Sequence, residues 1–179
     1  MSLEVKEKTK RKTRRIMLVL DNIRSSYNVG AILRSGEGFG VEKVLFDGIT
    51  PMPQDPELLP HLRAKVDRAI VKSALGAEAY VCCERAKNLA SELAILKKQG
   101  WQIVGLENNL PDKEVFALGS VKLEQQLGEK LILLLGEETK GIRPELLNIA
   151  DVLVEIPMRG NKESFNVSVA AGIALFGLT

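Results

Sequence analysis

Two short stretches, far apart in the chain, carry the same order of side-chain types. Residues 26–29 read SYNV and residues 164–167 read SFNV, and each opens onto small and apolar residues of helical character. Serine and asparagine commonly cap the first turn of a helix. The same neutral groups can orient a ligand by hydrogen bonding, although they are not strong bases. The pattern indicates either two ordinary helix starts or one polar site assembled from both ends of the chain.

Three polar loops follow apolar runs and offer further candidate ligand groups. They read ENN at residues 107–109, GEETKG at 136–141 and PMRGNKES at 157–164. Ligands of parallel α/β proteins bind just past the carboxyl ends of the strands, so we expect a ligand at these loops. Gly136 comes directly after a buried run and would let a ligand approach the backbone closely.

Two familiar nucleotide-binding patterns are excluded. The segment 136–141 lacks the Gly-Lys-Ser/Thr of a phosphate-binding loop, because Lys140 is followed by Gly141 and Ile142. The glycines between residues 36 and 40 close a helix, whereas a dinucleotide fingerprint opens one after a strand. A conventional Rossmann cofactor site is disfavoured for a similar reason, since residues 20–24, at the end of the first expected strand, read LDNIR and contain no glycine loop.

The elements that must position these loops alternate between strand and helix. Short, continuous apolar runs are typical of strands buried on both faces of a largely parallel sheet. The alternation predicts an α/β fold with helices on both faces of a mostly parallel sheet. Expected strands are residues 16–20, 44–46, 103–106, 131–135 and 152–156, and expected helices are 28–38, 62–73, 85–99, 144–150 and 164–178. The stretch 108–130 holds either a short strand or only a connection.

The first helix predicts an outward position for Arg34. Its apolar stripe follows helical spacing through Val29, Ile32, Leu33 and Gly36. At about 100° per residue, Arg34 points roughly opposite that stripe. It should face solvent or a ligand, and by default such an arginine is only a solvated charge.

The last helix has almost no polar face. Residues 167–176 read VSVAAGIALF, and a helix that is apolar all round must be buried all round. One side can pack on the sheet, and small residues on the other side would allow close approach of a second helix. We predict a homodimer built on this helix, with a helix wholly buried in its own domain as the weaker alternative.

Composition is that of a globular protein without a membrane span. The chain has 179 residues, 45% hydrophobic and 27% charged, which suits one domain with a substantial core. It contains no apolar run of the ~20 residues that a membrane span needs and no secretory leader, so we expect a cytoplasmic protein. Cys82 and Cys83 are adjacent and the chain has one histidine, His61. We therefore expect no disulfide, no metal site and two buried thiols.

Charge is unevenly placed although the net charge is only +2. Residues 1–14 form a basic arm ahead of a domain at residues 15–179. A basic arm suits a polyanion such as RNA, and a solvated, frayed terminus explains it equally well. Further basic residues in the loops, Lys140, Arg143, Arg159 and Lys162, are candidate phosphate contacts.

Three segments together resemble a known family. They are N-V-G-A-I-x-R-S-x-x-x-F-G from residue 28, L-L-L-G-E-E-x-x-G-I from 133, and I-P-M-x-G-x-x-x-S-F-N-V-S-V-A-A-G-I from 156. These resemble the motifs of the SpoU/TrmH branch of the SPOUT RNA methyltransferases. The likeness runs from about Arg15 to the C-terminus. Phe165 stands where leucine is commoner and Gly36 where alanine is commoner, and neither change removes a polar group.

The resemblance implies properties that composition and spacing do not. It implies a C-terminal trefoil knot, S-adenosylmethionine as methyl donor, a ribose 2′-hydroxyl of tRNA or rRNA as acceptor, and a dimer. The implied cofactor residues are Leu106, Gly136, Ile156, Met158 and Phe165. The implied catalytic residues are Asn28, Arg34, Glu138, Ser164 and Asn166. Predicted RNA contacts are Arg11, Arg14 and Arg15 of the arm and its junction, with the four basic loop residues named above.

Methyl transfer to a hydroxyl needs alignment of two atoms and departure of a proton. The resemblance gives Arg34 the role of general base, yet a guanidinium holds its proton above ~12. We hypothesise instead that Arg34 binds the target phosphate and stabilises the negative charge that develops on the ribose oxygen. The alternative function is a catalytically silent RNA-binding or scaffold protein with the same fold. The intact set of implied catalytic residues favours activity.

Overall fold

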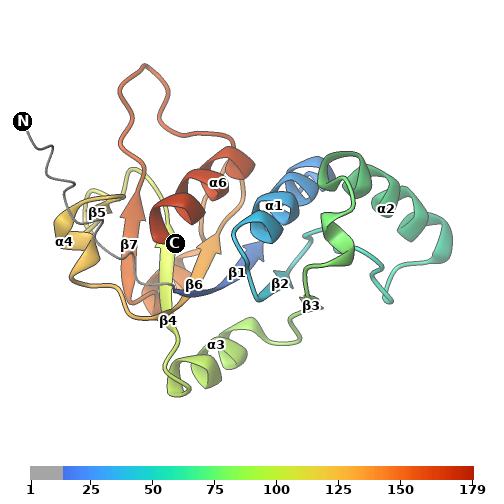
Figure 1. Cartoon of the computed structure of the whole chain (residues 1–179), viewed down its shortest axis with the longest axis horizontal. Helices are drawn as coiled ribbons and strands as arrows, with labels where there is room; N and C mark the ends of the chain where they lie inside the picture. Colours follow the sequence, from blue (N-terminus) through green and yellow to red (C-terminus); the bar gives the residue numbers. More distant parts are fainter. Residues whose placement is uncertain (1–13) are drawn as a thin grey trace, which may run out of the picture.

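A parallel sheet forms the centre of the computed structural model, which describes residues 14–179. Within these residues seven strands lie in the order β3-β2-β1-β6-β4-β7-β5, and every neighbouring pair is parallel (Figure 1). The strands are β1 (Arg15–Asp21), β2 (Lys43–Asp47), β3 (Cys83–Arg85), β4 (Gln102–Leu106), β5 (Phe116–Ala117), β6 (Lys130–Leu135) and β7 (Val152–Glu155). Residues 1–13 of the predicted arm, which include Arg11, lie outside the described residues.

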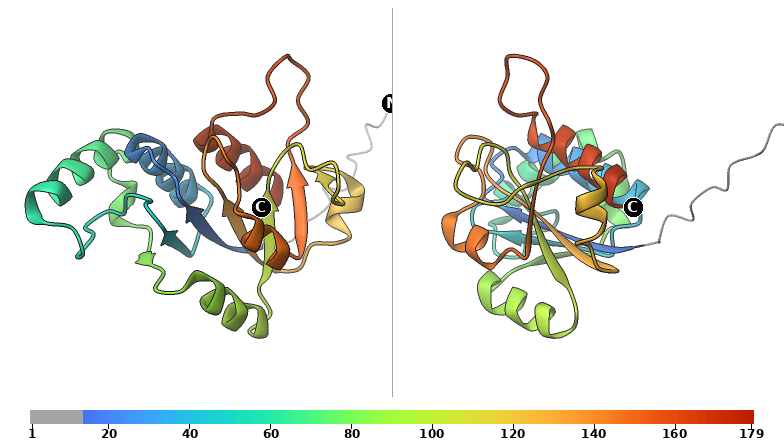
Figure 2. Two further views of the ribbon diagram at one scale, coloured as in Figure 1. Left: turned by 180° about the vertical axis from the view of Figure 1, so that it is seen from behind. Right: turned by 90° about the vertical axis from the view of Figure 1, so that its left-hand side faces the viewer.

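Helices cover both faces of this sheet (Figures 1 and 2). One core joins alternate strand residues such as Leu18 and Leu133 to the helices α1, α2, α4 and α6. A smaller core joins the intervening residues, such as Val19 and Leu134, to α3 and α5. The helices are α1 (Ser26–Gly38), α2 (Pro60–Ala74), α3 (Leu89–Lys98), α4 (Val121–Glu124), α5 (Pro144–Ile149) and α6 (Val167–Leu178), with a 3-10 turn η1 (Ala77–Ala79). The predicted α/β fold is confirmed.

The two matching stretches begin their helices differently, which corrects the prediction. Helix α1 starts at Ser26, because the Ser25 side chain accepts a hydrogen bond from the Asn28 backbone N–H. Helix α6 starts only at Val167, because the Asn166 Oδ1 accepts the Ser168 N–H at 2.9 Å. Ser164 is therefore not an N-cap. The two asparagines occupy different helical positions, one in the first turn and one at the cap.

The region around residues 82–89 also differs from expectation. Residues 83–85 form the edge strand β3, and α3 begins at Leu89, with the Asn88 side chain accepting the Ser91 N–H. The predicted helix start at residue 85 is wrong. So is the expectation of two buried thiols, because Cys82 is exposed and Cys83 is half-buried. The stretch 108–130 holds both a short strand, β5, and the short helix α4.

Helix α6 is apolar all round but is covered on one side only within a single chain. Ala171, Ala174 and Leu178 are buried in the core, whereas Val169 and Phe176 are 48% and 60% exposed. All-round burial is therefore not achieved within one chain. The trefoil knot stays a prediction, because strand order and pairing do not specify how the chain is threaded.

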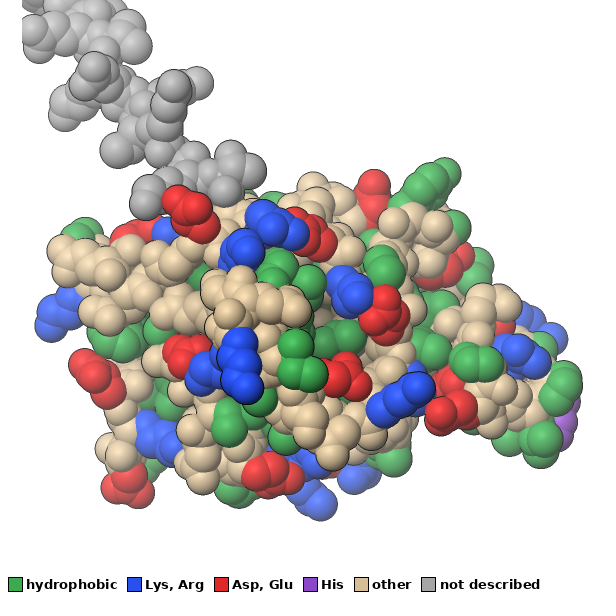
Figure 3. All heavy atoms as spheres, turned by 90° about the horizontal axis from the view of Figure 1, so that it is seen from below, with side chains coloured by type: hydrophobic (Ala, Val, Ile, Leu, Met, Phe, Trp, Pro, Cys, Tyr) green, Lys and Arg blue, Asp and Glu red, His purple; other side chains and the backbone are tan. Residues whose placement is uncertain are grey.

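The described surface mixes charges, and its helices are too short or too polar to cross a membrane. On the face seen in Figure 3, positive and negative side chains are interspersed. Among residues 14–179 no helix is long and apolar enough to span a bilayer.

Candidate active site at the ends of the central strands

A cavity of about 250 Å³ opens just past the carboxyl ends of β4, β6 and β7. All three predicted loops contribute to it, together with the first turn of α6. Four of the five predicted cofactor residues line it: Leu106, Gly136, Ile156 and Phe165. Met158 is half-buried but is not among the lining residues. The parallel strands thus bring together segments that are distant in sequence.

The reason for a glycine at position 136 differs from the one predicted. A Cβ on Gly136 would lie 2.3 Å from the carbonyl carbon of Gly141. The two ends of the loop are joined by hydrogen bonds from the Glu137 N–H to the Gly141 oxygen and from the Gly141 N–H to the Glu137 oxygen. Gly136 therefore allows the loop to close on its own backbone, and a ligand is not needed to explain it.

Glu107 and Asn108 hold the walls of the cavity. The Glu107 carboxylate accepts the Ile142 N–H at 2.8 Å and so fixes the far end of the 136–141 loop. The Asn108 side chain donates to the carbonyls of Ile156 and Glu163, at 3.1 and 3.2 Å, and accepts the Ile156 N–H at 3.2 Å. It therefore ties the start of the last loop to its end. Sequence reasoning singled out the 107–109 loop but gave neither residue a role, although a polar residue directly after a buried strand was the available signal.

A chain of side-chain hydrogen bonds joins three predicted catalytic residues. The Asn166 amide donates to the Asn28 oxygen at 3.2 Å, and the Asn28 amide donates to the Glu138 carboxylate at 2.8 Å. Glu138 lines the cavity, so this network connects the starts of α1 and α6 to the cavity wall. The two asparagines therefore meet within one chain. This network is the polar centre of the candidate site.

Ser164 and Arg34 lie apart from that network. Ser164 lines the cavity, whereas Arg34 is exposed and is not among the lining residues. The outward position predicted for Arg34 is confirmed. Six residues separate it from Asn28, which places it about 9 Å along α1 and about 120° round the helix. Among residues 14–179, no hydrogen bond or ion pair joins its guanidinium to that network.

Arg24 adds a contact that sequence reasoning missed. Its guanidinium pairs with the Glu137 carboxylate at 2.8 Å, and Thr139 donates a hydrogen bond to the same carboxylate. Glu137 is therefore neutralised on the β1 side of the cavity. No motif includes Arg24, so its position in the loop before α1 was the only signal.

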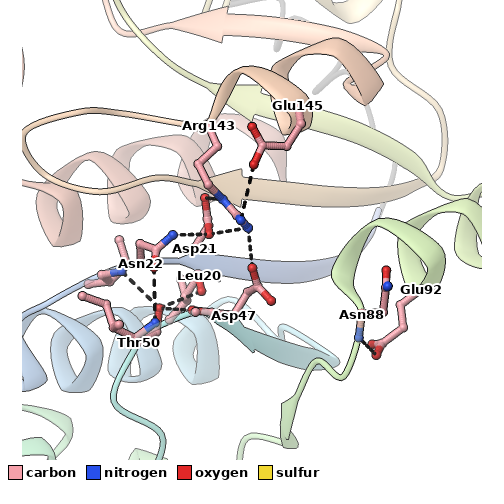
Figure 4. A network of polar contacts seen from close by, with 12 residues as sticks. Leu20, Asp21, Asn22, Asp47, Thr50, Asn88, Glu92, Arg143 and Glu145 are labelled. Carbon is pink, nitrogen blue, oxygen red and sulfur yellow. Dashed lines mark hydrogen bonds and ion pairs between the residues drawn. The ribbon is translucent and has the colours of Figure 1, made fainter.

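Arg143 is held by the carboxylates of Asp21 and Asp47 but keeps a side chain that is 39% exposed, so its predicted role as an RNA contact stays a prediction. Its guanidinium binds Asp21 at 2.9 Å and also pairs with Asp47, at the ends of β1 and β2 (Figure 4). The Asp21 side chain is fully buried. Burial raises the pKa of the Asp21 carboxyl, although the hydrogen bonds from Arg143 oppose that shift. Arg143 therefore anchors the end of the cavity loop to the sheet.

Two of the predicted contacts at the start of the domain are also engaged within the fold. Arg14 is only 8% exposed and binds Glu124 together with the carbonyls of Gly128 and Leu178. It is unavailable to RNA, which corrects that prediction. Arg15 pairs with Glu42 and lies over the Trp101 ring, although it is 54% exposed. Exposed candidates for phosphate contacts that remain in the loops are Lys140, Arg159 and Lys162.

The described residues also bear on metal chemistry. Within residues 14–179 no group of three or more histidine, cysteine, aspartate or glutamate side chains is arranged to hold a metal ion. His61 is exposed at the start of α2, far in sequence from the cavity loops. The site offers amides, carboxylates and an apolar wall.

Comparison with known proteins agrees with this architecture. The model of the SpoU rRNA Methylase family matches residues 15–176. Proteins named 23S rRNA (guanosine-2′-O-)-methyltransferase RlmB are among the relatives: that of Nitrosomonas europaea is 37% identical over 161 residues and that of Xylella fastidiosa 35%. Both matches cover 90% of this chain but 54% and 57% of the relatives. The chain thus spans little more than half the length of these relatives.

Solved structures show the same fold. A protein of the TrmH family from Porphyromonas gingivalis has a TM-score of 0.72 at 28% identity, covering 93% of this chain and 59% of that one. A TrmH/SpoU tRNA-modifying enzyme from A. aeolicus has the same TM-score at 26% identity, covering 93% of this chain and 76% of that one. The similarity extends over nearly the whole chain, including the segments that carry the cavity.

Proposed function

The chain belongs to the SpoU rRNA methylase family, and we propose that it transfers a methyl group from S-adenosylmethionine to a ribose 2′-hydroxyl of RNA. The observation that carries this proposal is the Asn166–Asn28–Glu138 network at the wall of the cavity. The names of the relatives support rRNA as substrate, and one structural neighbour is a tRNA-modifying enzyme. Such enzymes act where RNA is made and processed, so we place the protein in the cytoplasm.

The cavity residues fit the proposed methyl donor. The cavity has an apolar slot of the kind that a purine ring occupies, lined by Leu106, Leu135, Ile156 and Phe165. Backbone groups at the strand ends can form hydrogen bonds with the edge of that ring. Carboxylates of Glu107, Glu138 and Glu163 lie at the same cavity and favour a ligand that carries positive charge. When bound, S-adenosylmethionine supplies an activated methyl group on a sulfonium.

The neutral side chains of the site orient the acceptor rather than remove its proton. Asn28 and Asn166 are fixed by one another and by Glu138, so little side-chain entropy is lost when a ribose binds beside them. Ser164 at the cavity rim offers a hydroxyl to the same ribose. Their contribution is alignment of the 2′-oxygen, and alignment is a large part of the barrier for such a transfer.

Arg34 supplies charge to a site on a second subunit in this proposal. Within the described part of the chain it forms no hydrogen bond or ion pair with the Asn28 network, and α6 leaves Val169 and Phe176 exposed beside α1. A homodimer packed through this face of α6 would cover the apolar side chains and bring Arg34 of one chain to the cavity of the other. There the guanidinium binds the target phosphate and stabilises negative charge on the ribose oxygen, whose proton passes to phosphate or water.

Calorimetric titration with S-adenosylmethionine, without RNA, tests the cofactor part of the proposal. Wild-type protein should bind with micromolar affinity. Phe165→Ala, in the cavity wall, should weaken binding about tenfold, since it removes apolar area from the binding surface. Tyr27→Ala is the matched control, because Tyr27 is an exposed aromatic outside the lining. Absence of heat with a folded wild-type sample would instead favour a catalytically silent RNA-binding or scaffold protein.

A further inference from the structure

Helix α2 carries a stripe of basic side chains on its outer face. His61, Lys65, Arg68 and Lys72 recur at intervals of four, three and four residues, so they fall within about 60° of one another round the helix. All four are exposed. The opposite face holds Ile70 and Ala74, which are buried against the core. The stripe therefore points away from the body of the molecule along the whole helix.

This charge is not compensated by neighbouring acids. Within residues 14–179 none of the four side chains takes part in a hydrogen bond or an ion pair. Asp67, the acidic residue of α2, accepts hydrogen bonds from the backbone and side chain of Gln54 instead, both at 2.9 Å. Soluble helices usually interleave both signs on their outer face. An unpaired row of one sign favours a ligand of the opposite sign.

The stripe is fixed rigidly to the candidate active site. The Ser73 hydroxyl, one residue after Lys72, donates to the Tyr27 carbonyl at 2.8 Å, and Tyr27 precedes Asn28. At Gly30 the helices touch, because a Cβ there would lie 2.3 Å from the Ile70 carbonyl oxygen. The carboxyl end of α2 thus abuts the start of α1, and α2 extends outward from that point (Figure 1). A ligand strand leaving the site can follow the stripe.

We propose that the basic stripe of α2 binds the phosphate backbone of the RNA that carries the methylated ribose. This inference rests on the proposed function, because it takes RNA as the partner. From His61 to Lys72 the stripe is about 16 Å long, which spans several phosphates of one strand. Contacts of this kind supply affinity and orientation and carry no sequence information.

Two triple variants of equal charge test the proposal. The first is Lys65→Gln, Arg68→Gln and Lys72→Gln together. The control is Lys87→Gln, Lys98→Gln and Lys122→Gln, which are exposed lysines elsewhere whose ammonium groups are also unpaired within the described chain. Each triple variant removes three positive charges. Binding of a fluorescently labelled mixed-sequence RNA stem–loop is measured across salt concentrations, without S-adenosylmethionine.

The stripe variant should bind this RNA about tenfold more weakly. A plot of the logarithm of its association constant against the logarithm of salt concentration should have a slope that is shallower by about 0.7 to 0.9 for each phosphate that the variant no longer binds. The control should stay within about twofold of wild type. Equal weakening in both variants, or none in either, would overturn the proposal. The proposal would also be overturned if polyglutamate displaced the labelled RNA as effectively as unlabelled RNA does, because the stripe would then be a site for acidic protein.

Cofactor binding separates this inference from the proposed function. The stripe variant should bind S-adenosylmethionine with wild-type affinity, since the stripe contributes no residue to the cavity. If wild type binds RNA through the stripe but gives no heat with the cofactor, the methyltransferase proposal fails while the docking surface stands. If cofactor binding is intact but the stripe variant binds RNA normally, the docking surface fails alone.

Discussion

The side-chain amide of Asn166 donates a hydrogen bond to the side-chain oxygen of Asn28 at 3.2 Å, across 138 residues of sequence. Each asparagine has a second bond that fixes its orientation, from Asn28 to Glu138 and from the Ser168 N–H to Asn166. The amide groups therefore have one arrangement before any ligand binds. We expect this preorganised network to contribute to the rate of catalysis more than to the stability of the fold.

Asn28→Ala should lower the rate of methyl transfer about 10²-fold and leave cofactor affinity nearly unchanged, because Asn28 orients the acceptor but does not line the cavity. Its effect on the free energy of unfolding should be about 1 kcal/mol or less, since the network is exposed. Ser26→Ala, in the same turn, is the control. Single-turnover kinetics would contradict the assignment if both variants kept the wild-type rate.

Arg143→Met should destabilise the protein at neutral pH by about 2 to 4 kcal/mol. It leaves the fully buried Asp21 beside Asp47 without its cationic partner and with the Asn22 side-chain amide as its remaining side-chain donor, and the loss is moderated because Arg143 itself is 39% exposed. Chemical denaturation measures the loss. Glu145→Gln, on the exposed side of the same guanidinium, should change the free energy of unfolding by no more than about 0.5 kcal/mol.

The Arg143→Met defect should shrink as the pH falls. Burial already raises the pKa of Asp21 in the wild type, and loss of the guanidinium should raise it further. The folded variant then takes up a proton more readily than the unfolded chain. Its stability relative to wild type should improve as the pH drops through the variant's raised pKa, and should stop improving once Asp21 of the wild type is protonated as well. If the loss of unfolding free energy in Arg143→Met stays constant between neutral and acid pH, the destabilisation does not come from the buried Asp21 carboxylate.

Asn108→Ala should weaken S-adenosylmethionine binding at least about tenfold. The last loop would lose its hydrogen bonds at both Ile156 and Glu163. The N–H of the buried Ile156 would lose its acceptor, which costs about 1 to 3 kcal/mol of stability. Asn161→Ala, exposed in the same loop, is the matched control. Calorimetry and thermal melting together check the outcome. Unchanged affinity with lowered stability would mean that Asn108 only supports the fold.

The exposed face of α6 predicts a homodimer. Val169→Glu should shift wild-type dimer toward monomer in sedimentation equilibrium, because it places a charge on the apolar interface without disturbing the core. Val121→Glu is a fair control, since Val121 is an exposed valine on α4. Mixing Asn28→Ala with Arg34→Ala should restore part of the methyl transfer, because one site of each mixed dimer is intact. A wild-type monomer at every concentration, or no restoration on mixing, would exclude the shared site.

Much of this architecture follows from local sequence. The runs at β1 and β6 are apolar without alternation because both faces of the sheet are covered, and their alternation with helical stretches predicts an α/β fold. The three polar loops were found for the same reason, since they follow those runs. Arg34 was correctly placed outward from helical spacing.

The contacts that sequence reasoning missed are non-local. Arg143 looks like a free loop cation in sequence, and only the pairing of β1 with β2 sets Asp21 and Asp47 beside it. In sequence, Arg14 looks like part of a basic arm. In the fold it contacts the last turn of α6 and Glu124, which are distant in sequence. The helix starts were misplaced because residue type alone does not choose between Ser25 and Ser26, or between Ser164 and Asn166, as the cap.

Transfer of labelled methyl groups tests the central claim most directly. Purified protein is incubated with methyl-labelled S-adenosylmethionine and RNA from cells that lack the protein, and the RNA is digested to nucleosides. We predict label in a 2′-O-methylated nucleoside, and loss of that label with Asn28→Ala but not with Ser26→Ala. Label on a base, or no label from folded protein that binds both the cofactor and RNA, would contradict it.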